Sequence, residues 1–223
     1  MLPLLSECRF GSLLAYTPRP STPNARWAKD FCLCIKQDGV VVLGHKRVRA
    51  IAYAAKRLRD RLDETPFGTL LGDRTVLVPT PGSGMLVAGA LWPAKRLCDE
   101  LVANGLGLCV WAALHRSRAV TKSALVEAKD RPKAQEHYDS LECRGSRPLD
   151  LRRAERVVVV DDVITRGATM LAAVSHLVEA VSQAEVAGFA LLRTISRPEE
   201  LRAVLSPTTG TIRLRRGEAY REP

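Results

Sequence analysis

Two adjacent acids and a short glycine-containing loop stand together in one stretch of the sequence. The four valines Val157–Val160 precede Asp161 and Asp162, and Thr165-Arg166-Gly167 follows shortly after. Ligands of open α/β sheets sit at the carboxyl ends of the strands, so we expect both carboxylates where a small molecule would bind. Adjacent acids repel each other, and vicinal hydroxyls or a magnesium shell would compensate that repulsion.

Residues 165–169 offer the groups that a phosphate monoester needs. Gly167 lets the backbone approach a ligand closely, and Thr165 and Thr169 can donate from their hydroxyls. Successive N–H groups at a helix amino terminus would point at the anion, with the helix dipole behind them. Acids for a sugar diol, followed directly by a cradle for its phosphate, describe a ribose phosphate site.

A second turn contains glycines and hydroxyls as well. Pro79-Thr80-Pro81-Gly82-Ser83-Gly84 follows the apolar run Val76–Val78 and could present backbone N–H groups to another anion. The same composition is common in ordinary loops. Its position, one strand-helix-strand unit before the paired acids, favours the ligand-binding interpretation.

The elements that must position these residues alternate regularly between strands and helices from Arg74 onward. We predict strands at Val76–Val78, Gly107–Ala113, Val157–Val160 and Val186–Leu192, and helices near Ala94–Ala103 and Ala168–Ala180. This order predicts an α/β fold with a central parallel sheet and flanking helices. The unbroken β-branched run at 157–160 is typical of a strand that is buried on both faces.

The remaining segments are expected to surround this core. Residues 17–26 contain three prolines, so residues 1–30 are expected to be an extended lead-in, and residues 31–195 the packed domain. We expect a strand at Phe31–Lys36, a turn at 37–39 and an amphipathic helix at Val48–Leu62. The polar stretch 115–148 is expected to be a flap. Residues 196–223 are expected to form a small cap with a strand at Thr211–Arg215.

The segment 157–169 resembles the phosphoribosyl pyrophosphate loop of type I phosphoribosyltransferases, with an apolar strand, two acids, two aliphatic residues and T-x-G-x-T. The resemblance extends over residues 70–195 and is nearest to the competence protein F group, whose zinc-ribbon cysteines this chain lacks. It implies that Asp161 and Asp162 are the catalytic pair and hold the ribose hydroxyls. It also implies that the phosphate is bound by Thr165, Arg166, Gly167, Ala168 and Thr169. Arg166 departs from the small residue usual in the family, and either adds a cation for the phosphate or faces water.

The same resemblance implies a pyrophosphate site and a mobile loop. Pyrophosphate would be bound by Thr80, Pro81, Gly82, Ser83, Arg118 and Lys122. Arg131 is a further candidate, and the flap cations could equally be solvated loop charges. Mg²⁺ would bind through the ligand near the paired acids, with no direct side-chain ligand assigned. In purine-salvage members an acid commonly stands where this chain has Thr165, so we do not expect a 6-oxopurine acceptor.

The implied function is transfer of the phosphoribosyl group of phosphoribosyl pyrophosphate to an unidentified nitrogen acceptor, with release of pyrophosphate. A non-catalytic nucleotide-sensing regulator and a competence-type DNA-processing accessory factor remain alternatives. A Walker B strand or a receiver domain would also place acids after a strand. However, the chain has no G-x-x-x-x-G-K-[ST], and a receiver would place its acids near the start of the fold.

Composition and charge indicate the kind of ligand and the cellular compartment, but they identify no partner. The 34 basic and 24 acidic residues give a net charge of +10, which attracts anions from pyrophosphate to RNA. No motif supports a nucleic-acid partner, and a homodimer is compatible with the sequence. The six cysteines are expected to be mostly buried free thiols, and the four histidines lack metal-ligand spacing. We expect no secretory signal, no membrane span and a cytoplasmic location.

Overall fold

The computed structural model describes residues 3–121, 131–181 and 183–222. Its centre is a seven-stranded mixed sheet in the order β11-β10-β1-β9-β8-β4-β5. The neighbouring strands β1, β9, β8, β4 and β5 are parallel. Its strands are β1 (Glu7–Tyr16), β4 (Thr75–Pro79), β5 (Cys109–Val110), β8 (Arg156–Ile164), β9 (Glu185–Thr194), β10 (Leu205–Arg215) and β11 (Glu218–Glu222). The α/β prediction with a central parallel sheet is therefore confirmed.

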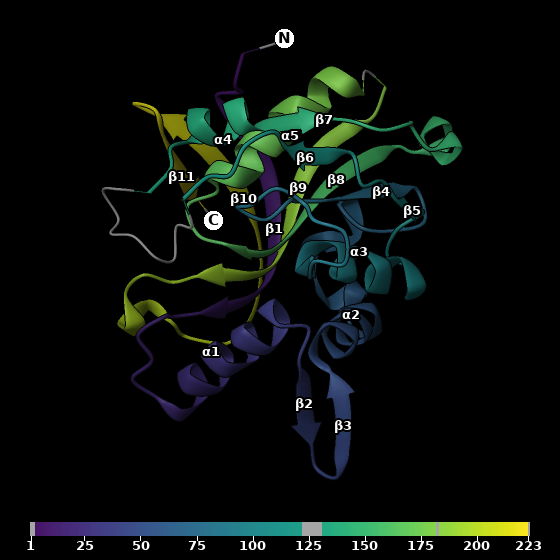
Figure 1. Ribbon diagram of the computed structural model, residues 1–223. Helices are drawn as coiled ribbons and strands as arrows, with labels where there is room; N and C mark the ends of the chain where they lie inside the picture. Colours follow the sequence, from purple (N-terminus) through teal and green to yellow (C-terminus); the bar gives the residue numbers. More distant parts are fainter. Residues whose placement is uncertain (1–2, 122–130, 182, 223) are drawn as a thin grey trace.

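Helices cover both faces of this sheet (Figure 1). One face packs against α1 (Pro23–Lys36), α2 (Ala50–Asp60) and α3 (Pro93–Ala103), and the other against α4 (Ala134–Ser140) and α5 (Ala168–Ala180). The valines of β8 explain this arrangement, because Val158 and Val160 belong to the first core and Val157 and Val159 to the second. All four are fully buried, as predicted for a strand covered on both faces.

Short elements connect the layers. β2 (Val40–Leu43) and β3 (Lys46–Arg49) form a hairpin that projects from the body of the molecule (Figure 1). β6 (Leu114–Arg116) and β7 (Leu141–Cys143) form a second antiparallel pair. The 3₁₀ helices are Leu62–Glu64, Pro66–Thr69, Leu149–Arg153 and Pro198–Glu200. In the described part of the chain, no helix has the length and apolar character needed to cross a membrane.

The first thirty residues are not an extended lead-in. Residues 7–16 form β1, which lies between β9 and β10. Helix α1 begins at Pro23 and is capped by Thr22, whose hydroxyl accepts a hydrogen bond from the Ala25 amide at 3.2 Å. The predicted strand at Phe31–Lys36 is also wrong, since these residues complete α1. The buried positions of this helix recur every three or four residues, which is the helical period, and a six-residue window is too short to show it.

The other elements follow the predictions more closely. α5 has the predicted bounds, while α2, α3, β4, β8 and β9 overlap their predicted ranges. The strand predicted at 107–113 contains only the two residues of β5, and residues 134–143 of the expected flap form α4 and β7. The predicted terminal strand is longer than expected, because β10 and β11 form a hairpin through Arg216 and Gly217. Both of these turn residues have positive φ, of 51° and 80°, as a tight two-residue hairpin turn requires.

All six cysteines are free. Cys8, Cys32 and Cys98 are buried, Cys34 and Cys109 are half-buried, and Cys143 is exposed. The expectation of free thiols is confirmed, and burial holds for half of them. Burial raises the pKa of the Cys8 thiol to about 12, so this thiol packs as a neutral apolar group.

Candidate functional site

The paired acids lie at the carboxyl end of β8, inside the last residues of the strand. Pairing with β9 continues past them, with Asp161 opposite Ala190 and Ile164 opposite Arg193. The strand is longer than the predicted 157–160 because β9 also extends, to Thr194. The two carboxylates therefore emerge at the sheet edge where ligands of parallel α/β folds bind.

Asp161 is held by two hydrogen bonds to one carboxylate oxygen. Its Oδ1 accepts from the Thr80 hydroxyl at 2.8 Å and from the Asp162 amide at 3.0 Å. Removal from water, and then the charge of Asp162, raise the pKa of Asp161 well above its usual range. The pair therefore tends to retain a proton, and a cation or sugar hydroxyls beside it would relieve the repulsion.

The loop after β8 has the shape of an anion cradle. Gly167 is the N-cap residue of α5 and has a left-handed φ of 95°. Among the described residues, no side chain accepts a hydrogen bond from the first N–H groups of the helix. A Cβ atom on Gly167 would lie 2.8 Å from the Ile212 side chain, so both the conformation and the space require glycine. The predicted phosphate-binding segment 165–169 thus directly follows the acids and begins a helix.

The two loop threonines contact neighbouring elements. Thr165 Oγ1 lies 3.4 Å from Thr194 Oγ1 at the end of β9, and Thr169 Oγ1 lies 3.4 Å from His137 Nδ1 on α4. Both contacts are long for hydrogen bonds to a hydroxyl. The Thr165 hydroxyl can therefore turn toward an arriving ligand at small cost, while the Thr169 hydroxyl lies beside His137.

Arg166, which departs from the family pattern, has an acidic neighbour on β11, and its role toward the phosphate stays a prediction. Its Nη1 lies 3.1 Å from Glu218 Oε2, so it pairs with a carboxylate of β11. Arg221, on the same strand, donates to the carbonyls of Ile164 at 3.0 Å and Thr194 at 2.8 Å. The terminal hairpin therefore braces the 165–169 loop, which is called the phosphate loop below after its predicted role. Sequence reasoning missed this because Arg221 lies far along the chain in an unremarkable charged tail.

The turn after β4 is fixed beside the acids. The Thr80 amide donates to the Val160 carbonyl at 2.9 Å, and Trp92 Nε1 donates to the Thr80 carbonyl at 2.6 Å. The carbonyls of Gly82 and Ser83 accept from Arg116 Nε and from the Val120 amide, each at 2.8 Å.

The orientation of these carbonyls determines in which direction the backbone N–H groups of the turn can donate to a ligand. In a trans peptide the N–H points opposite to the carbonyl, so the amides of Ser83 and Gly84 point away from Arg116 and Val120. The Thr80 hydroxyl contacts Asp161, and Pro81 is buried and has no N–H. The pyrophosphate role of Thr80–Ser83 remains a prediction, in which the backbone amides of Ser83 and Gly84 are two of the donors.

The flap cations separate into three cases. Arg118 is exposed. Burial, and to a smaller extent the charge of Arg118, lower the pKa of Arg116 to about 10, which indicates that the two guanidinium groups lie near each other. Lys122 lies outside the described residues. Arg131 has a buried Nε without a hydrogen-bond partner among the residues that the structure describes. Their roles toward pyrophosphate stay predictions.

Lys36 is a site residue that sequence reasoning missed. Burial by itself would lower the pKa of Lys36, but the charge of Asp162, followed by those of Cys32, Tyr16 and Asp161, raises it. The ammonium group at the end of α1 therefore lies in the field of the paired acids. The sequence predicts a strand for residues 31–36, and nothing in that prediction brings Lys36 to this edge of the sheet.

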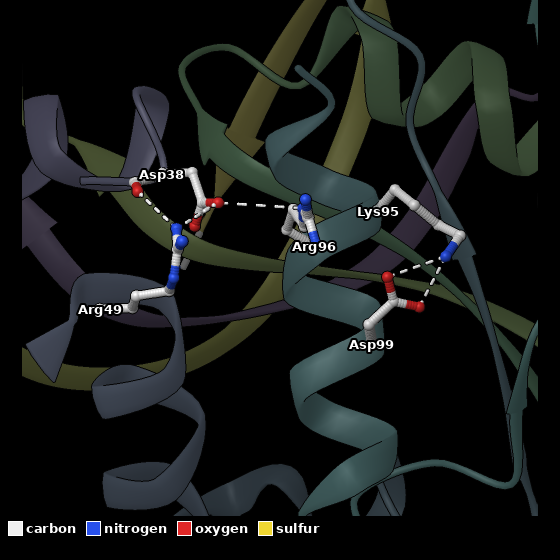
Figure 2. A network of polar contacts seen from close by, with 5 residues as sticks. All are labelled: Asp38, Arg49, Lys95, Arg96 and Asp99. Atoms are coloured by element: carbon white, nitrogen blue, oxygen red, sulfur yellow. Dashed lines mark hydrogen bonds and ion pairs between the residues drawn. The ribbon is translucent and has the colours of Figure 1, made fainter. Parts of the chain in front are cut away.

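A polar network anchors the chain that follows Lys36 (Figure 2). Arg49 Nη1 lies 2.9 Å from Asp38 Oδ2 and 3.2 Å from the Asp38 carbonyl, and Arg96 Nε approaches the same carboxylate at 3.8 Å. Asp38 has a φ of 49°, a conformation that aspartate tolerates better than most residues. The network ties the end of α1 to the base of the β2–β3 hairpin and to α3.

The described residues contain no group of three side chains placed to hold a metal ion. Asp161 and Asp162 do offer carboxylate oxygens, which suit Mg²⁺, and their mutual repulsion favours a cation. Mg²⁺ usually keeps several waters and binds through one or two carboxylates together with substrate phosphates. The site thus fits a magnesium ion that arrives with a phosphorylated ligand.

Comparison with known proteins adds one match. A family model described as phosphoribosyl transferase domain matches residues 43–209. The matched region contains the turn after β4, both acids and the whole 165–169 loop. No curated protein matches the chain.

Proposed function

Because the chain belongs to the phosphoribosyl transferase domain family, we propose that it binds phosphoribosyl pyrophosphate and transfers the phosphoribosyl group to a nitrogen acceptor. Asp161 and Asp162 would hold the ribose hydroxyls, and residues 165–169 would hold the 5′-phosphate. The observation that carries this proposal is the direct succession of a carboxylate pair at a strand end and an uncapped helix start with a left-handed glycine.

The reaction would form a nitrogen–carbon bond at the anomeric carbon and break the bond from that carbon to the pyrophosphate oxygen. The bonding electron pair leaves with pyrophosphate, and the nitrogen loses its proton to solvent. Carboxylates beside the ring stabilise the positive charge that develops on the sugar, so electrostatic stabilisation supplies most of the rate enhancement. When bound, Mg²⁺ would neutralise charge on the departing pyrophosphate.

Pyrophosphate would bind at the turn after β4. The amides of Ser83 and Gly84 are among the donors that the turn offers, and Arg118 and Lys122 would add positive charge. Cations on a segment near the ligand neutralise the leaving group more strongly where water is excluded.

The acceptor is constrained by what stands next to the sugar. Thr165 and its neighbour Thr194 are neutral, so no carboxylate stands at this position to assist a 6-oxopurine. Lys36 brings a cation into the field of the acids. We propose an acceptor that does not require a base at position 165. We also propose that the protein acts in a reducing, cytoplasmic setting, with its six free cysteines in support.

A ligand-sensing regulator is the second candidate. The projecting β2–β3 hairpin places Lys46, Arg47 and Arg49 on the surface, and this basic arm is suited to an anionic partner. Such a protein would keep the ribose phosphate site but would not catalyse the transfer reaction.

Calorimetric titration with phosphoribosyl pyrophosphate and Mg²⁺, followed by a pyrophosphate-release assay over candidate amines and bases, tests the proposal. We expect saturable binding and release with at least one acceptor. Binding without release on any acceptor would support the regulator, and no binding at all would overturn the site assignment.

A further inference from the structure

A buried arginine lies between the turn after β4 and the phosphate loop. Arg116, on β6, is only 5% exposed. Its Nε donates to the Gly82 carbonyl at 2.8 Å, its Nη1 donates to the Ser140 hydroxyl, and its Nη2 lies 3.0 Å from His137 Nδ1. One guanidinium group therefore joins the 79–84 turn to two residues of α4.

The contact with Arg116 determines the protonation of His137. A guanidinium group only donates hydrogen bonds, so Nδ1 of His137 must be the acceptor and the ring proton must be on Nε2. Burial, followed by the charge of Arg116, lowers the pKa of His137 from 6.5 to about 4. The imidazole is therefore neutral at physiological pH and is available as a fixed acceptor.

His137 extends the connection to the phosphate loop. Its Nδ1 lies 3.4 Å from the Thr169 hydroxyl, which can approach an unprotonated nitrogen only as a donor. The Ser140 hydroxyl donates to the His137 carbonyl at 2.8 Å, which fixes the backbone of the same helix turn. The chain of contacts thus runs from Gly82 through Arg116 and His137 to Thr169.

We propose that Arg116 and His137 are positioning residues that hold the 79–84 turn and the 165–169 loop at the separation required by one ligand with phosphate groups at both ends. The proposal rests on the proposed function, because such a ligand is phosphoribosyl pyrophosphate. Neither residue needs to touch the ligand. A ligand already bound at one of the two segments binds the other intramolecularly, which raises its affinity. This gain exists only while the two segments keep the separation that the ligand spans.

Matched variants separate this role from a general effect on folding. His137→Asn keeps an acceptor near the Nδ1 position, whereas His137→Phe keeps a ring of similar size without one. Arg116→Lys keeps the charge but lacks the fork that reaches three acceptors. Arg144→Gln removes an exposed guanidinium next to β7 that pairs with Glu142, and serves as the control.

Titration of each variant with phosphoribosyl pyrophosphate, ribose 5-phosphate and inorganic pyrophosphate, each with Mg²⁺, tests the proposal. Arg116→Lys and His137→Phe should weaken phosphoribosyl pyrophosphate binding by about tenfold or more, while either half-ligand changes by less than about threefold. His137→Asn and Arg144→Gln should bind all three ligands like the wild type. Thermal unfolding of each variant shows how much of any loss comes from a less stable fold.

The outcomes distinguish the two levels of inference. A wild-type protein that binds none of the three ligands would overturn the proposed function and this inference with it. Wild-type binding together with unchanged affinity in Arg116→Lys and His137→Phe would overturn the positioning role alone. Equal losses for all three ligands, or a His137→Asn variant that behaves like His137→Phe, would also reject it.

Discussion

Two carboxylates that are adjacent in the chain differ in their surroundings. Asp161 accepts hydrogen bonds from Thr80 and from the Asp162 amide, and it is shielded from water enough to raise its pKa. Lys36 stands in the field of Asp162 and partly offsets the negative charge. Repulsion of this kind is retained in proteins mainly where a ligand uses it, and this is why we place binding and catalysis on these residues.

Replacing both acids with asparagine should abolish binding of phosphoribosyl pyrophosphate and leave the fold intact or more stable. The raised pKa of Asp161 means that the native state holds its proton more tightly than the unfolded chain does. Its stabilising effect is present at low pH and is lost as the pH rises through the native pKa. Asparagine keeps the Oδ1 acceptor and cannot ionise, so the gain in the free energy of unfolding should grow with pH.

Calorimetry and urea unfolding over a range of pH check the two parts of this prediction. Asp99→Asn is a matched control, because Asp99 lies on α3 in a half-buried pair with Lys95 (Figure 2). It should change neither ligand affinity nor the pH dependence. Unchanged affinity in the Asp161→Asn, Asp162→Asn double variant would count against the site.

The elements of the site differ in how far the sequence predicts them. The paired acids and the 165–169 loop could be identified because strand, acids, glycine and helix start are contiguous. Helix α5 was predicted with correct bounds because glycine and a long apolar run mark it locally. By contrast, Lys36, Arg116 and Arg221 reach the site from distant elements, and only the sheet order brings them there.

The misassigned amino-terminal segment has a physical explanation. Its three prolines lie between β1 and the early part of α1, in a short connection, and one of them begins the helix as its first residue. Residues 7–16 pair on one side with the parallel strand β9 and on the other with β10, both of which come almost two hundred residues later. Nothing local in the sequence marks such pairing.

Contact between the phosphate loop and the terminal hairpin predicts a cost for Gly167→Ala. The added Cβ would meet Ile212 at 2.8 Å, and alanine would have to adopt a φ of 95°. The backbone conformation alone should cost about 1–2 kcal/mol, and the clash adds to it. Urea unfolding and ribose 5-phosphate titration should show lower stability and weaker binding.

A double-mutant cycle with Ile212→Ala separates the two contributions. Ile212 is fully buried, so its truncation alone should cost about 2–5 kcal/mol. It also removes the atoms that clash with the new Cβ, and the double variant should be less destabilised than the sum of the single variants. Simple additivity would show that the clash is absent and that strain in the backbone is the whole effect.

At the scale of the whole molecule, both ends of the chain belong to the sheet that carries the site. β1 lies beside β9, and the β10–β11 hairpin extends the sheet beyond it and contacts the loop through Glu218, Arg221 and Ile212. The family match ends at residue 209, before most of this hairpin. The bracing of the phosphate loop by β11 is therefore a contribution of this chain outside the matched region.

Global stability should fall on acidification because of one buried imidazole. His137 has a native pKa of about 4 against an ordinary value of 6.5, owing to burial and then to Arg116. Between these values the unfolded chain binds a proton that the native protein refuses, so the free energy of unfolding decreases as the pH falls. The loss should approach about 3 kcal/mol, since one pKa unit corresponds to about 1.4 kcal/mol. Asp161 acts in the opposite direction, because its raised pKa favours the native state at low pH.

Urea unfolding of the wild type and of His137→Asn isolates the histidine from every other titrating group, because the other groups are common to both proteins. Between about pH 7 and pH 4, the free energy of unfolding should fall by about 3 kcal/mol more for the wild type than for the variant. Above the ordinary histidine pKa, it should depend on pH in nearly the same way in both proteins. If the two proteins lost stability in parallel, His137 would be free to protonate in the native state. The Arg116 side chain would then face a cation instead of an acceptor, and the connection between the two anion-binding segments could not exist in the form that the structure shows.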